Sequence, residues 1–531
     1  MRFFWIAVIT VSAALAARPA SAQQPFHLCG VVDAIDYPID GLVEGYDDFG
    51  LFRARFGGNH VGVDIGFERW GDPVAAAARG RVTYADPEGW DTERGVVILE
   101  HTFPDGSIAY TLYGHMEQSD DIKFPRLGDC VERGQVIGTI GWPSRGLPHL
   151  HYEIRSFLPD DGGPGYITAN PLDAGWYNPF DFTELWRLRL APGFVSSATF
   201  RVVPSAPPAL LDYGVYVVAS GSLIAGTLPS GEVLWRVETS GAVTGLAALP
   251  GGRVVARSHG GQTITLQNGR YLAVWDVPGP DTPFAALGET LVFATADGGL
   301  DAYTPLGALL WRVPGVGAAA RPLELAASAD QVLALTRTSG GVLARVVSAD
   351  GAVLFETTYS DAAAAAPDRS GGWLLLDGPY IRRIAGGENH SIGTLAPPPG
   401  RTARITVDVM GNIYVYSADG ALISISSGGG ARWRTPYPAA GALPPLLATG
   451  GGCLLYSLDA SGALNVFDTS SGALLRQAQI YAGGRRSGSP AARLLTVDAN
   501  ERVHAAAGYL SVVTLDGWAL SGLSNTDCRL G

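Results

Sequence analysis

The sequence predicts an all-β protein with two unlike parts: an N-terminal antiparallel β domain and a β-propeller of seven or eight blades. Two observations support this fold class. Residues 26–182 contain short alternating strands separated by Gly and Pro turns, and helical periodicity is scarce there. From about residue 200, a unit of roughly 40 residues with several strands recurs to the end of the chain. This is the period typical of propeller blades.

The length and composition of the chain set the class of protein. With 531 residues it is too long for one compact core, so two or three domains are expected. Hydrophobic residues make up 47% and charged residues only 16%, which indicates a folded chain. The formal charge of −13 argues against binding of nucleic acid or other polyanions through bulk electrostatics.

Residues 1–22 have the pattern of a cleavable signal peptide. Arg2 precedes an apolar run from Phe3 to Leu15, and residues 20–22, Ala-Ser-Ala, supply a small-x-small cleavage site. A membrane anchor is the alternative, but this run is too short to span a bilayer, and no later stretch of 18 apolar residues exists. We therefore expect an exported protein, periplasmic, on the cell surface or extracellular, with no membrane span in the mature chain.

Export places the four cysteines in an oxidising compartment, where they can form disulfides. Four cysteines allow three connectivities. Pairing Cys29 with Cys130 and Cys453 with Cys528 keeps each bridge within one part of the chain, and this is the expected arrangement. Unpaired, buried thiols are the alternative.

The N-terminal β domain is expected at residues 23–190. Longer loops are expected at residues 86–94 and 157–171, which are rich in Gly, Pro and Asp. The runs that predict strands are residues 80–85, 95–101, 107–115, 134–141 and 149–155.

The propeller is expected at residues 200–531. In each repeat an apolar strand meets a Gly turn, a second strand, another Gly turn and a third strand. Eight units are recognisable, so eight blades are expected, or seven if one unit is degenerate; an irregular β-sandwich array is the alternative. Trp235 and Trp311, with a variant at Trp433, fit an aromatic side chain packed between blades. The first strands of the units begin near Val215, Val254, Leu291, Val332, Trp373, Asn412, Cys453 and Val503.

Histidines of the N-terminal domain form the pattern of a metal site. In "NHVGVDIG", His60 and Asp64 stand four residues apart and can supply two corners of a tetrahedral zinc site. In "PHLHYEIR", His149 and His151 stand two apart, so on a strand they project from the same face. One can bind the metal while the other reaches its water, which leaves a fourth corner open, as in catalytic zinc sites. Between these segments, His115 ends the alternating run "YTLYGH".

In this order, "HVGVDIG", "YTLYGHM" and "PHLHYEIR" resemble the LytM/lysostaphin-type zinc metalloendopeptidases, over about residues 56–172. The resemblance implies three zinc ligands and two catalytic imidazoles. The ligands would be His60, Asp64 and His151, and the imidazoles His149 and His115. One imidazole would act as the base and the other would stabilise the oxyanion, and the sequence leaves open which is the base. No HExxH motif is present, so a glutamate base is not expected.

The same resemblance implies a peptide substrate, with the stem peptides or cross-bridges of peptidoglycan as the first expectation. The repeats resemble PQQ-type propellers, so the propeller is expected to bind a protein or a wall component. The sequence has no adjacent cysteine pair and no clustered calcium ligands, so a quinone dehydrogenase is not expected. Two alternatives remain: a non-hydrolytic scaffold of the cell envelope, and a secreted endopeptidase that acts on proteins.

Three further residues near the histidines have less specific signals. His101 closes a strand and is expected to be structural or to support another site residue. Glu153 shares the strand face of His149 and His151, so it could orient a ligand ring or form a surface ion pair. Tyr113 could help to bind the oxyanion, but a place in the core is expected.

Overall fold

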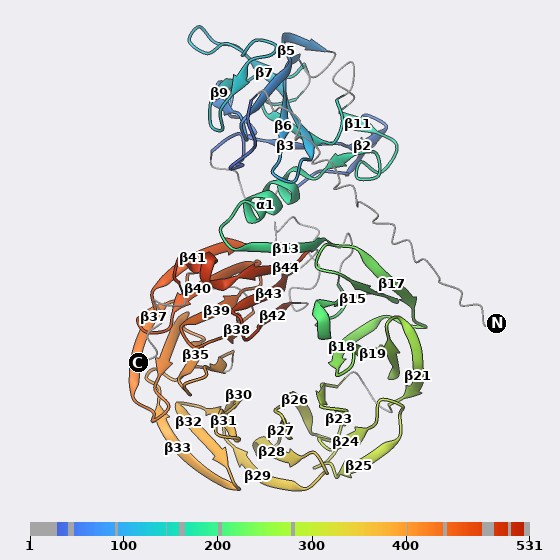
Figure 1. Ribbon diagram of the computed structural model, residues 1–531, viewed down its shortest axis with the longest axis vertical. Coiled ribbons are helices and arrows are strands. Elements are labelled where there is room, and N and C mark those ends of the chain that lie inside the picture. Colours follow the sequence, from blue (N-terminus) through green and yellow to red (C-terminus); the bar gives the residue numbers. More distant parts are fainter. Residues whose placement is uncertain are drawn as a thin grey trace, which may run out of the picture.

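Figure 1 shows the computed structural model, in which a β domain lies beside a ring of sheets. The expected signal peptide, residues 1–22, lies outside the described residues. The described residues are 29–40, 47–90, 94–144, 146–158, 165–199, 204–277, 282–400, 402–438, 443–480, 493–507 and 511–524.

The N-terminal part has one three-stranded and one nine-stranded sheet. Its elements are β1 (Phe52–Arg53), β2 (Gly58–His60), β3 (Val63–Ile65), β4 (Pro73–Ala75), β5 (Gly80–Trp90), β6 (Arg94–Thr102), β7 (Ile108–Glu117), β8 (Cys130–Val131), β9 (Val136–Ile140), β10 (Leu150–Arg155), β11 (Tyr166–Ile167), β12 (Trp176–Tyr177) and α1 (Pro179–Arg189). The large sheet has the order β12-β10-β7-β6-β5-β8, with β3 paired to β10 and β9 paired to β4 and β7. All five strands expected from the sequence are present, as β5, β6, β7, β9 and β10.

Two features of this part differ from what the sequence indicates. The sequence predicts a loop over residues 86–94, but β5 continues to Trp90, which pairs with Arg94 of β6 after a register shift that follows Asp86. Such a bulged hairpin end lacks the regular alternation that marks a strand. The sequence also gives no sign of α1, because its apolar residues serve two cores and form no single stripe.

The propeller consists of eight four-stranded antiparallel sheets within the described residues, which settles the blade number there at eight. The first four blades are β14 (Ala209–Leu210), β15 (Tyr216–Ser220), β16 (Leu223–Thr227) and β17 (Val233–Glu238); β18 (Val243–Leu249), β19 (Arg253–Ser258), β20 (Gln262–Gln267) and β21 (Arg270–Asp276); β22 (Phe284–Leu287), β23 (Thr290–Ala294), β24 (Leu300–Tyr303) and β25 (Leu309–Val313); β26 (Arg321–Ala327), β27 (Gln331–Thr338), β28 (Gly341–Ser348) and β29 (Val353–Tyr359). The next three are β30 (Ala362–Pro367), β31 (Trp373–Asp377), β32 (Tyr380–Ala385) and β33 (Glu388–Thr394); β34 (Arg404–Val407), β35 (Ile413–Ser417), β36 (Ala421–Ile425) and β37 (Ala431–Pro436); β38 (Leu446–Thr449), β39 (Leu454–Leu458), β40 (Ala463–Asp468) and β41 (Leu474–Gln479). The last is β13 (Phe194–Thr199) with β42 (Leu494–Val497), β43 (Arg502–Ala507) and β44 (Ser511–Asp516), and the short helices are η1 (Asp212–Gly214) and α2 (Gly517–Ser521).

The eighth blade closes the ring with a strand from the other end of the propeller. β13 pairs with β44, so this sheet joins residues from both ends of the ring (Figure 1). The Tyr216 hydroxyl of the first blade lies 2.6 Å from Thr514 Oγ1 and 2.8 Å from His504 Nδ1 of the eighth. The two blades also share a buried apolar cluster of Tyr216, Ala506 and Val512, so the closed ring covers the facing surfaces of its first and last blades.

The repeat unit predicted from the sequence begins one strand later than the blade in the structure. Every strand expected to begin a unit is the second strand of its sheet, from β15 through β43. The first strands lie nearest the centre of the ring in Figure 1. They are short or rich in small residues, such as Ala209–Leu210 of β14 and Ala362–Pro367 of β30, so they show little alternation.

In several blades, a tryptophan of the outer strand packs against the following blade. Trp311 of the third blade donates from Nε1 to the Ala349 carbonyl of the fourth at 2.8 Å. Its ring covers Gly351, where an added Cβ would lie 2.7 Å from Trp311 Cγ. Trp235 over Gly269, Trp275 over Gly307 and Trp433 over Gly472 repeat this arrangement. The aromatic packing between blades predicted at Trp235, Trp311 and Trp433 is therefore confirmed.

Replacing Gly351 by Ala is expected to lower the free energy of unfolding of the propeller by at least about 2 kcal/mol. Gly351 has φ of +91°, and its missing Cβ makes room for the indole. Gly371 is the matched control, because it has φ of +89° and nothing within 4 Å of an added Cβ. Gly371→Ala should lose only about 1 kcal/mol, since it meets the backbone penalty alone. Calorimetry of both variants tests this, and equal losses would contradict it.

Helix α1 joins the two parts. Asn178 caps its start, accepting from Phe180 N and Asp181 N. Trp186 belongs to the core of the N-terminal part and stacks on Phe103 at 4.1 Å, whereas Leu188 belongs to the core of the last blades. We therefore propose a domain boundary between α1 and β13, a few residues before the one expected from the sequence.

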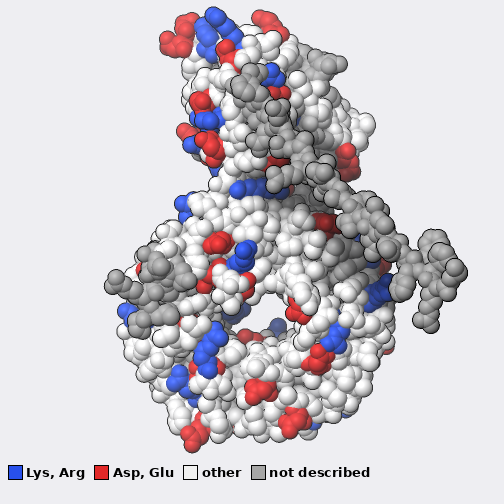
Figure 2. Space-filling model, viewed as in Figure 1, with Lys and Arg blue, Asp and Glu red and all other residues white. Residues whose placement is uncertain are grey.

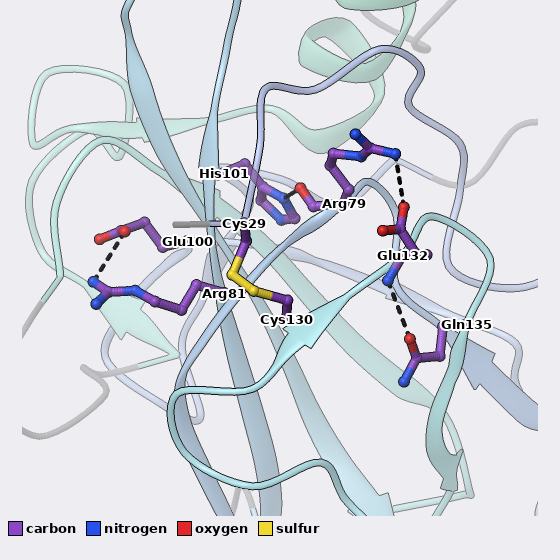
Figure 3. Close-up of a disulfide and its surroundings, with 8 residues drawn as sticks. All are labelled: Cys29, Arg79, Arg81, Glu100, His101, Cys130, Glu132 and Gln135. Carbon is purple, nitrogen blue, oxygen red and sulfur yellow. Dashed lines mark hydrogen bonds and ion pairs between the residues drawn. A yellow bond between two sulfur atoms is a disulfide. The ribbon is translucent and has the colours of Figure 1, made fainter. Parts of the chain in front are cut away.

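A disulfide between Cys29 and Cys130, with Cα atoms 5.3 Å apart, ties the start of the described chain to β8. In Figure 3 it lies among the hydrogen-bonded side chains of Arg79, Glu132 and His101. Cys453 is described, but its expected partner Cys528 lies outside the described residues.

Charged side chains of both signs are interspersed on the face seen in Figure 2, which shows no continuous basic patch among the described residues there. No helix in the described part of the chain is long and apolar enough to cross a bilayer.

Candidate active site

Three donor side chains converge where the three-stranded sheet meets the large sheet. His60 ends β2, Asp64 lies in β3 and His151 lies in β10, where His151 is paired directly with Asp64 across the two strands. His60 Nε2 lies 3.0 Å from His151 Nδ1 and 3.4 Å from Asp64 Oδ1. Asp64 Oδ1 lies 3.1 Å from His151 Nδ1. The strand pairing thus brings together residues that are almost 90 positions apart.

The spacing of these donors fits a tetrahedral metal ion. Donors about 2.0–2.1 Å from zinc at tetrahedral angles lie about 3.3 Å from one another. The three observed separations, 3.0, 3.1 and 3.4 Å, bracket that value. One carboxylate and two imidazoles are also a donor set that suits a divalent transition metal. These residues can therefore hold a cation with little movement.

Two more histidines face the same cluster. His149 Nε2 lies 3.5 Å from Asp64 Oδ1, and its Nδ1 lies 2.7 Å from the Leu147 carbonyl, to which a protonated Nδ1 donates. The His115 ring lies 4.7 Å from that of His149 and 6.0 Å from that of His151. All five residues singled out in the sequence lie together in the structure.

His115 takes up an unusual backbone conformation to reach this position. Its φ is +58°, in the left-handed region, and Gly141 N donates to its carbonyl at 2.7 Å. Left-handed backbone is uncommon for residues other than glycine, although His, Asn and Asp adopt it more readily than most. The conformation breaks the alternation of β7, and the strand pattern alone does not predict it.

Two buried carboxylates hold the outer nitrogens of the donor imidazoles. Asp48, which is fully buried, has Oδ2 at 3.0 Å from His60 Nδ1, and its Oδ1 accepts from Asp64 N at 3.1 Å. Glu153 Oε1 lies 2.8 Å from His151 Nε2. Such contacts fix the orientation and tautomer of metal-binding imidazoles.

Glu153 is itself held by two neighbours. Its Oε2 accepts from Trp176 Nε1 at 2.9 Å and lies 3.3 Å from Arg155 Nη2. Burial raises the pKa of Glu153, but Arg155 and the hydrogen bonds outweigh it and lower that pKa. Of the two roles considered for Glu153, orienting a ligand ring is therefore the one that the structure supports.

The electrostatics of the cluster favour a bound cation. Burial lowers the pKa of His60, but Asp64 and the hydrogen bond to Asp48 outweigh it and raise that pKa to about 9. Burial raises the pKa of Asp64, but His60 and the hydrogen bonds to neighbouring imidazoles hold it well below its usual range. The carboxylates therefore attract positive charge, carried by a proton or by a metal ion.

Aromatic rings flank the donors on two sides. Tyr166 of β11 stacks on His60 with centroids 4.9 Å apart, and Phe56 stacks on Tyr166 at 4.3 Å. Phe67 stacks on His149 at 5.1 Å. The sequence predicts a loop at Tyr166, and no motif includes Tyr166 or Asp48. The contacts of these two residues with the site therefore could not be predicted from the sequence.

His101 and Tyr113 belong to the core and not to the site. His101 Nδ1 lies 2.8 Å from the Arg79 carbonyl and Nε2 lies 2.7 Å from Thr111 Oγ1. Burial lowers the pKa of His101 to about 4, so its ring is neutral and structural. The Tyr113 hydroxyl accepts from Ala77 N at 2.9 Å inside the core.

Comparisons with protein families agree with the division of the chain into an N-terminal β domain and a propeller. Residues 58–164 match the family described as Peptidase family M23, which includes all three donors and both further histidines. Residues 177–363 and 296–519 match the family described as Outer membrane protein assembly factor BamB, and together they cover more than half of the chain. The chain belongs to the BamB family through its propeller and carries an M23 peptidase domain. The resemblance to LytM-type peptidases is thereby confirmed, and the M23 domain gives the chain the fold and residue pattern of a peptidase.

Solved structures resemble the propeller at low sequence identity. BamB from Moraxella catarrhalis is 17% identical, with a TM-score of 0.45 over 61% of this chain and 97% of that chain. The computationally designed Ika8 protein is 17% identical, with a TM-score of 0.47 over 61% of this chain and 99% of that chain. Sqt1 from Saccharomyces cerevisiae is 11% identical, with a TM-score of 0.48 over 61% of this chain and 99% of that chain. No curated protein matches the chain.

Proposed function

We propose that the protein is an exported zinc metalloendopeptidase that hydrolyses peptide bonds in peptidoglycan stem peptides or cross-bridges. The observation that carries the proposal is the convergence of His60 Nε2, Asp64 Oδ1 and His151 Nδ1 at separations of 3.0–3.4 Å. These three side chains would hold the zinc. Bound there, zinc would polarise the scissile carbonyl and lower the pKa of a water molecule.

His149 and His115 would carry the proton transfer and the charge stabilisation. With its Nδ1 proton donated to the Leu147 carbonyl, a neutral His149 presents an unprotonated Nε2 toward Asp64. That nitrogen can take a proton from water and pass it to the leaving amine. The His115 ring, 4.7 Å from His149, can donate to the developing oxyanion. The contacts of the His149 nitrogens favour His149 as the base.

The family match and the sequence support the proposed substrate and location. The M23 match supports a peptide substrate, and peptidoglycan is the substrate that the LytM resemblance implies. The signal-peptide pattern supports export, and the Cys29–Cys130 disulfide is compatible with an oxidising compartment. The propeller would bind a protein or wall component close to the substrate.

Digestion of purified sacculi tests the proposal. The full mature chain, loaded with one equivalent of zinc, is incubated with sacculi and, in parallel, with casein. Mass spectrometry of soluble fragments should find new peptide termini from sacculi. Cleavage of casein alone would favour the secreted protein-directed peptidase. A zinc-loaded chain that cleaves neither substrate would overturn the hydrolase.

A non-hydrolytic envelope scaffold is the second candidate, and the breadth of the BamB-family match favours it. In that case the M23 domain would dock a partner and the propeller would be the main binding surface. Comparing the wild type with His149→Ala separates the two functions. A scaffold keeps its cellular role in that variant, whereas a peptidase loses it.

Replacing Asp48 by Asn is expected to weaken zinc affinity by about 10–100-fold. The carboxylate holds His60 Nδ1 at 3.0 Å, so the neutral amide leaves the ring less basic and less well oriented. Competition with a chromogenic chelator measures the affinity. Asp33→Asn is the matched control, because Asp33 is exposed and lies 3.7 Å from Arg79, away from the donors. Equal affinity in both variants would contradict the positioning role of Asp48.

Zinc affinity is expected to rise with pH up to about pH 9. In the metal-free protein the pKa of His60 is about 9, and the protonated ring cannot bind metal. Below that pH each zinc bound must displace this proton, so affinity should fall by about tenfold per pH unit as the pH decreases. Chelator competition between pH 6 and pH 9 in buffers that do not bind zinc measures the slope. A flat profile would show that His60 is unprotonated before zinc binds.

A further inference from the structure

A carboxylate bonded by two exposed tryptophan residues lies in the N-terminal domain near the histidine cluster. Trp70 is 62% exposed and Trp142 is 48% exposed, with ring centroids 6.2 Å apart at an angle of 72°. Glu117 Oε2 accepts from Trp70 Nε1 at 3.0 Å, and Glu117 Oε1 accepts from the Trp142 backbone N at 2.9 Å. The two bonds fix the carboxylate while each oxygen keeps a lone pair for an outside donor. We call these three residues the indole–carboxylate patch.

The backbone places this patch next to His115. Glu117 is two residues beyond His115 on β7, about 7 Å along the strand. Gly141 N donates to the His115 carbonyl, and Trp142 follows Gly141. An added Cβ on Gly141 would lie 2.5 Å from Glu117 Cγ, so the glycine makes room for the carboxylate.

The other indole is also close to the cluster. Trp70 follows three residues after Phe67, whose ring stacks on His149 at 5.1 Å. The patch is therefore connected through neighbouring residues to His115 and His149, whereas Tyr166 contacts His60. A substrate residue there would be one or two positions from a bond held between those histidines.

The chemistry of the patch selects a cation. Among the described residues, the donors bonded to the Glu117 carboxylate are Trp70 Nε1 and the Trp142 backbone N, neither of which carries a positive charge. Indole faces attract ammonium groups, and a fixed carboxylate adds a charge-assisted acceptor. A sugar ring could stack on an indole, but the negative charge contributes nothing specific to a neutral sugar. We propose that the indole–carboxylate patch binds a primary ammonium group on a side chain of the peptide substrate. This inference rests on the proposed function.

Binding of paired peptides tests the inference without cleavage. The probes are alanine pentapeptides, acetylated and amidated at their ends, with one lysine at each internal position in turn. Each is compared with the same peptide acetylated on the lysine Nζ. The protein is the full zinc-loaded chain with His149→Ala, so that no probe is hydrolysed, and calorimetry measures the dissociation constants.

For at least one lysine position, the free amine should bind about tenfold more tightly than its acetylated partner. Glu117→Gln should bring that ratio close to one, and Trp70→Leu should reduce it. Trp70 is largely exposed, so that variant should fold normally, which circular dichroism and zinc content check. Asp121→Asn, an exposed acid of the same domain, should keep the ratio.

Two outcomes would overturn the inference. One is equal affinity for the free and acetylated peptides at every position, and the other is an unchanged preference in Glu117→Gln. Failure of the wild type to cleave sacculi, with the amine preference intact, would instead count against the proposed function and leave the patch in place.

Discussion

His151→Ala is expected to lose its zinc while the β domain remains folded. His151 Nδ1 lies 3.0 Å from His60 Nε2 and 3.1 Å from Asp64 Oδ1, so its ring supplies the third donor. Two donors without the third should bind zinc about a thousandfold more weakly. After gel filtration, metal analysis should find zinc near background, and release of fragments from sacculi should fall to the level of buffer.

Two controls make this result specific. His390 is an exposed histidine on β33 of the propeller, so His390→Ala should keep stoichiometric zinc and full activity. The His151 variant leaves Glu153 without its imidazole partner, which should lower stability by about 1–3 kcal/mol without unfolding the domain. Stoichiometric zinc in folded His151→Ala would show that the ligand assignment is wrong.

His149→Ala is expected to keep zinc and lose hydrolysis. His149 Nε2 is 3.5 Å from Asp64 Oδ1, but three other side chains supply the close donor set, so metal content should be unchanged. Removing a general base typically lowers turnover by about 10²–10⁴-fold. Turnover of a peptide released from sacculi measures the effect, with zinc content determined on the same samples.

The pH profile distinguishes the two histidines. If His149 is the base, the acidic limb of kcat/KM should disappear in His149→Ala and persist in His115→Ala at reduced height. The pKa of His149 is raised: burial lowers it, but the hydrogen bond and charge of Asp64 outweigh burial. If the His149→Ala variant turns over substrate as fast as the wild type, His149 has no part in the mechanism.

The candidate site was predictable where chemistry requires particular residues at short spacing. In H-x-H, strand alternation is enough to place His149 and His151 on one face, and in H-x-x-x-D the short spacing keeps His60 and Asp64 close; the structure brings both pairs together. Asp48 and Tyr166 contact the same cluster but belong to segments with no periodic pattern. The indole–carboxylate patch likewise joins three segments whose proximity depends on the pairing of β7 and β9.

The propeller was predictable as a repeat but not in its phase. Gly turns and apolar second strands recur at regular spacing in the sequence. The first strands have too little alternation of apolar and polar residues to be recognised there. The pairing of β13 with β44 could not be read from sequence either, because it joins segments more than 300 residues apart.

The sequence by itself determined the all-β class, the repeat and the five histidine and aspartate side chains with metal-site chemistry, because each depends on local spacing. Only the tertiary structure decided which carboxylates support those imidazoles, where the ring closes and which face of the cluster carries Glu117. Those features arise from strand pairing and burial between distant segments, and their free energy depends on packing that no local pattern records.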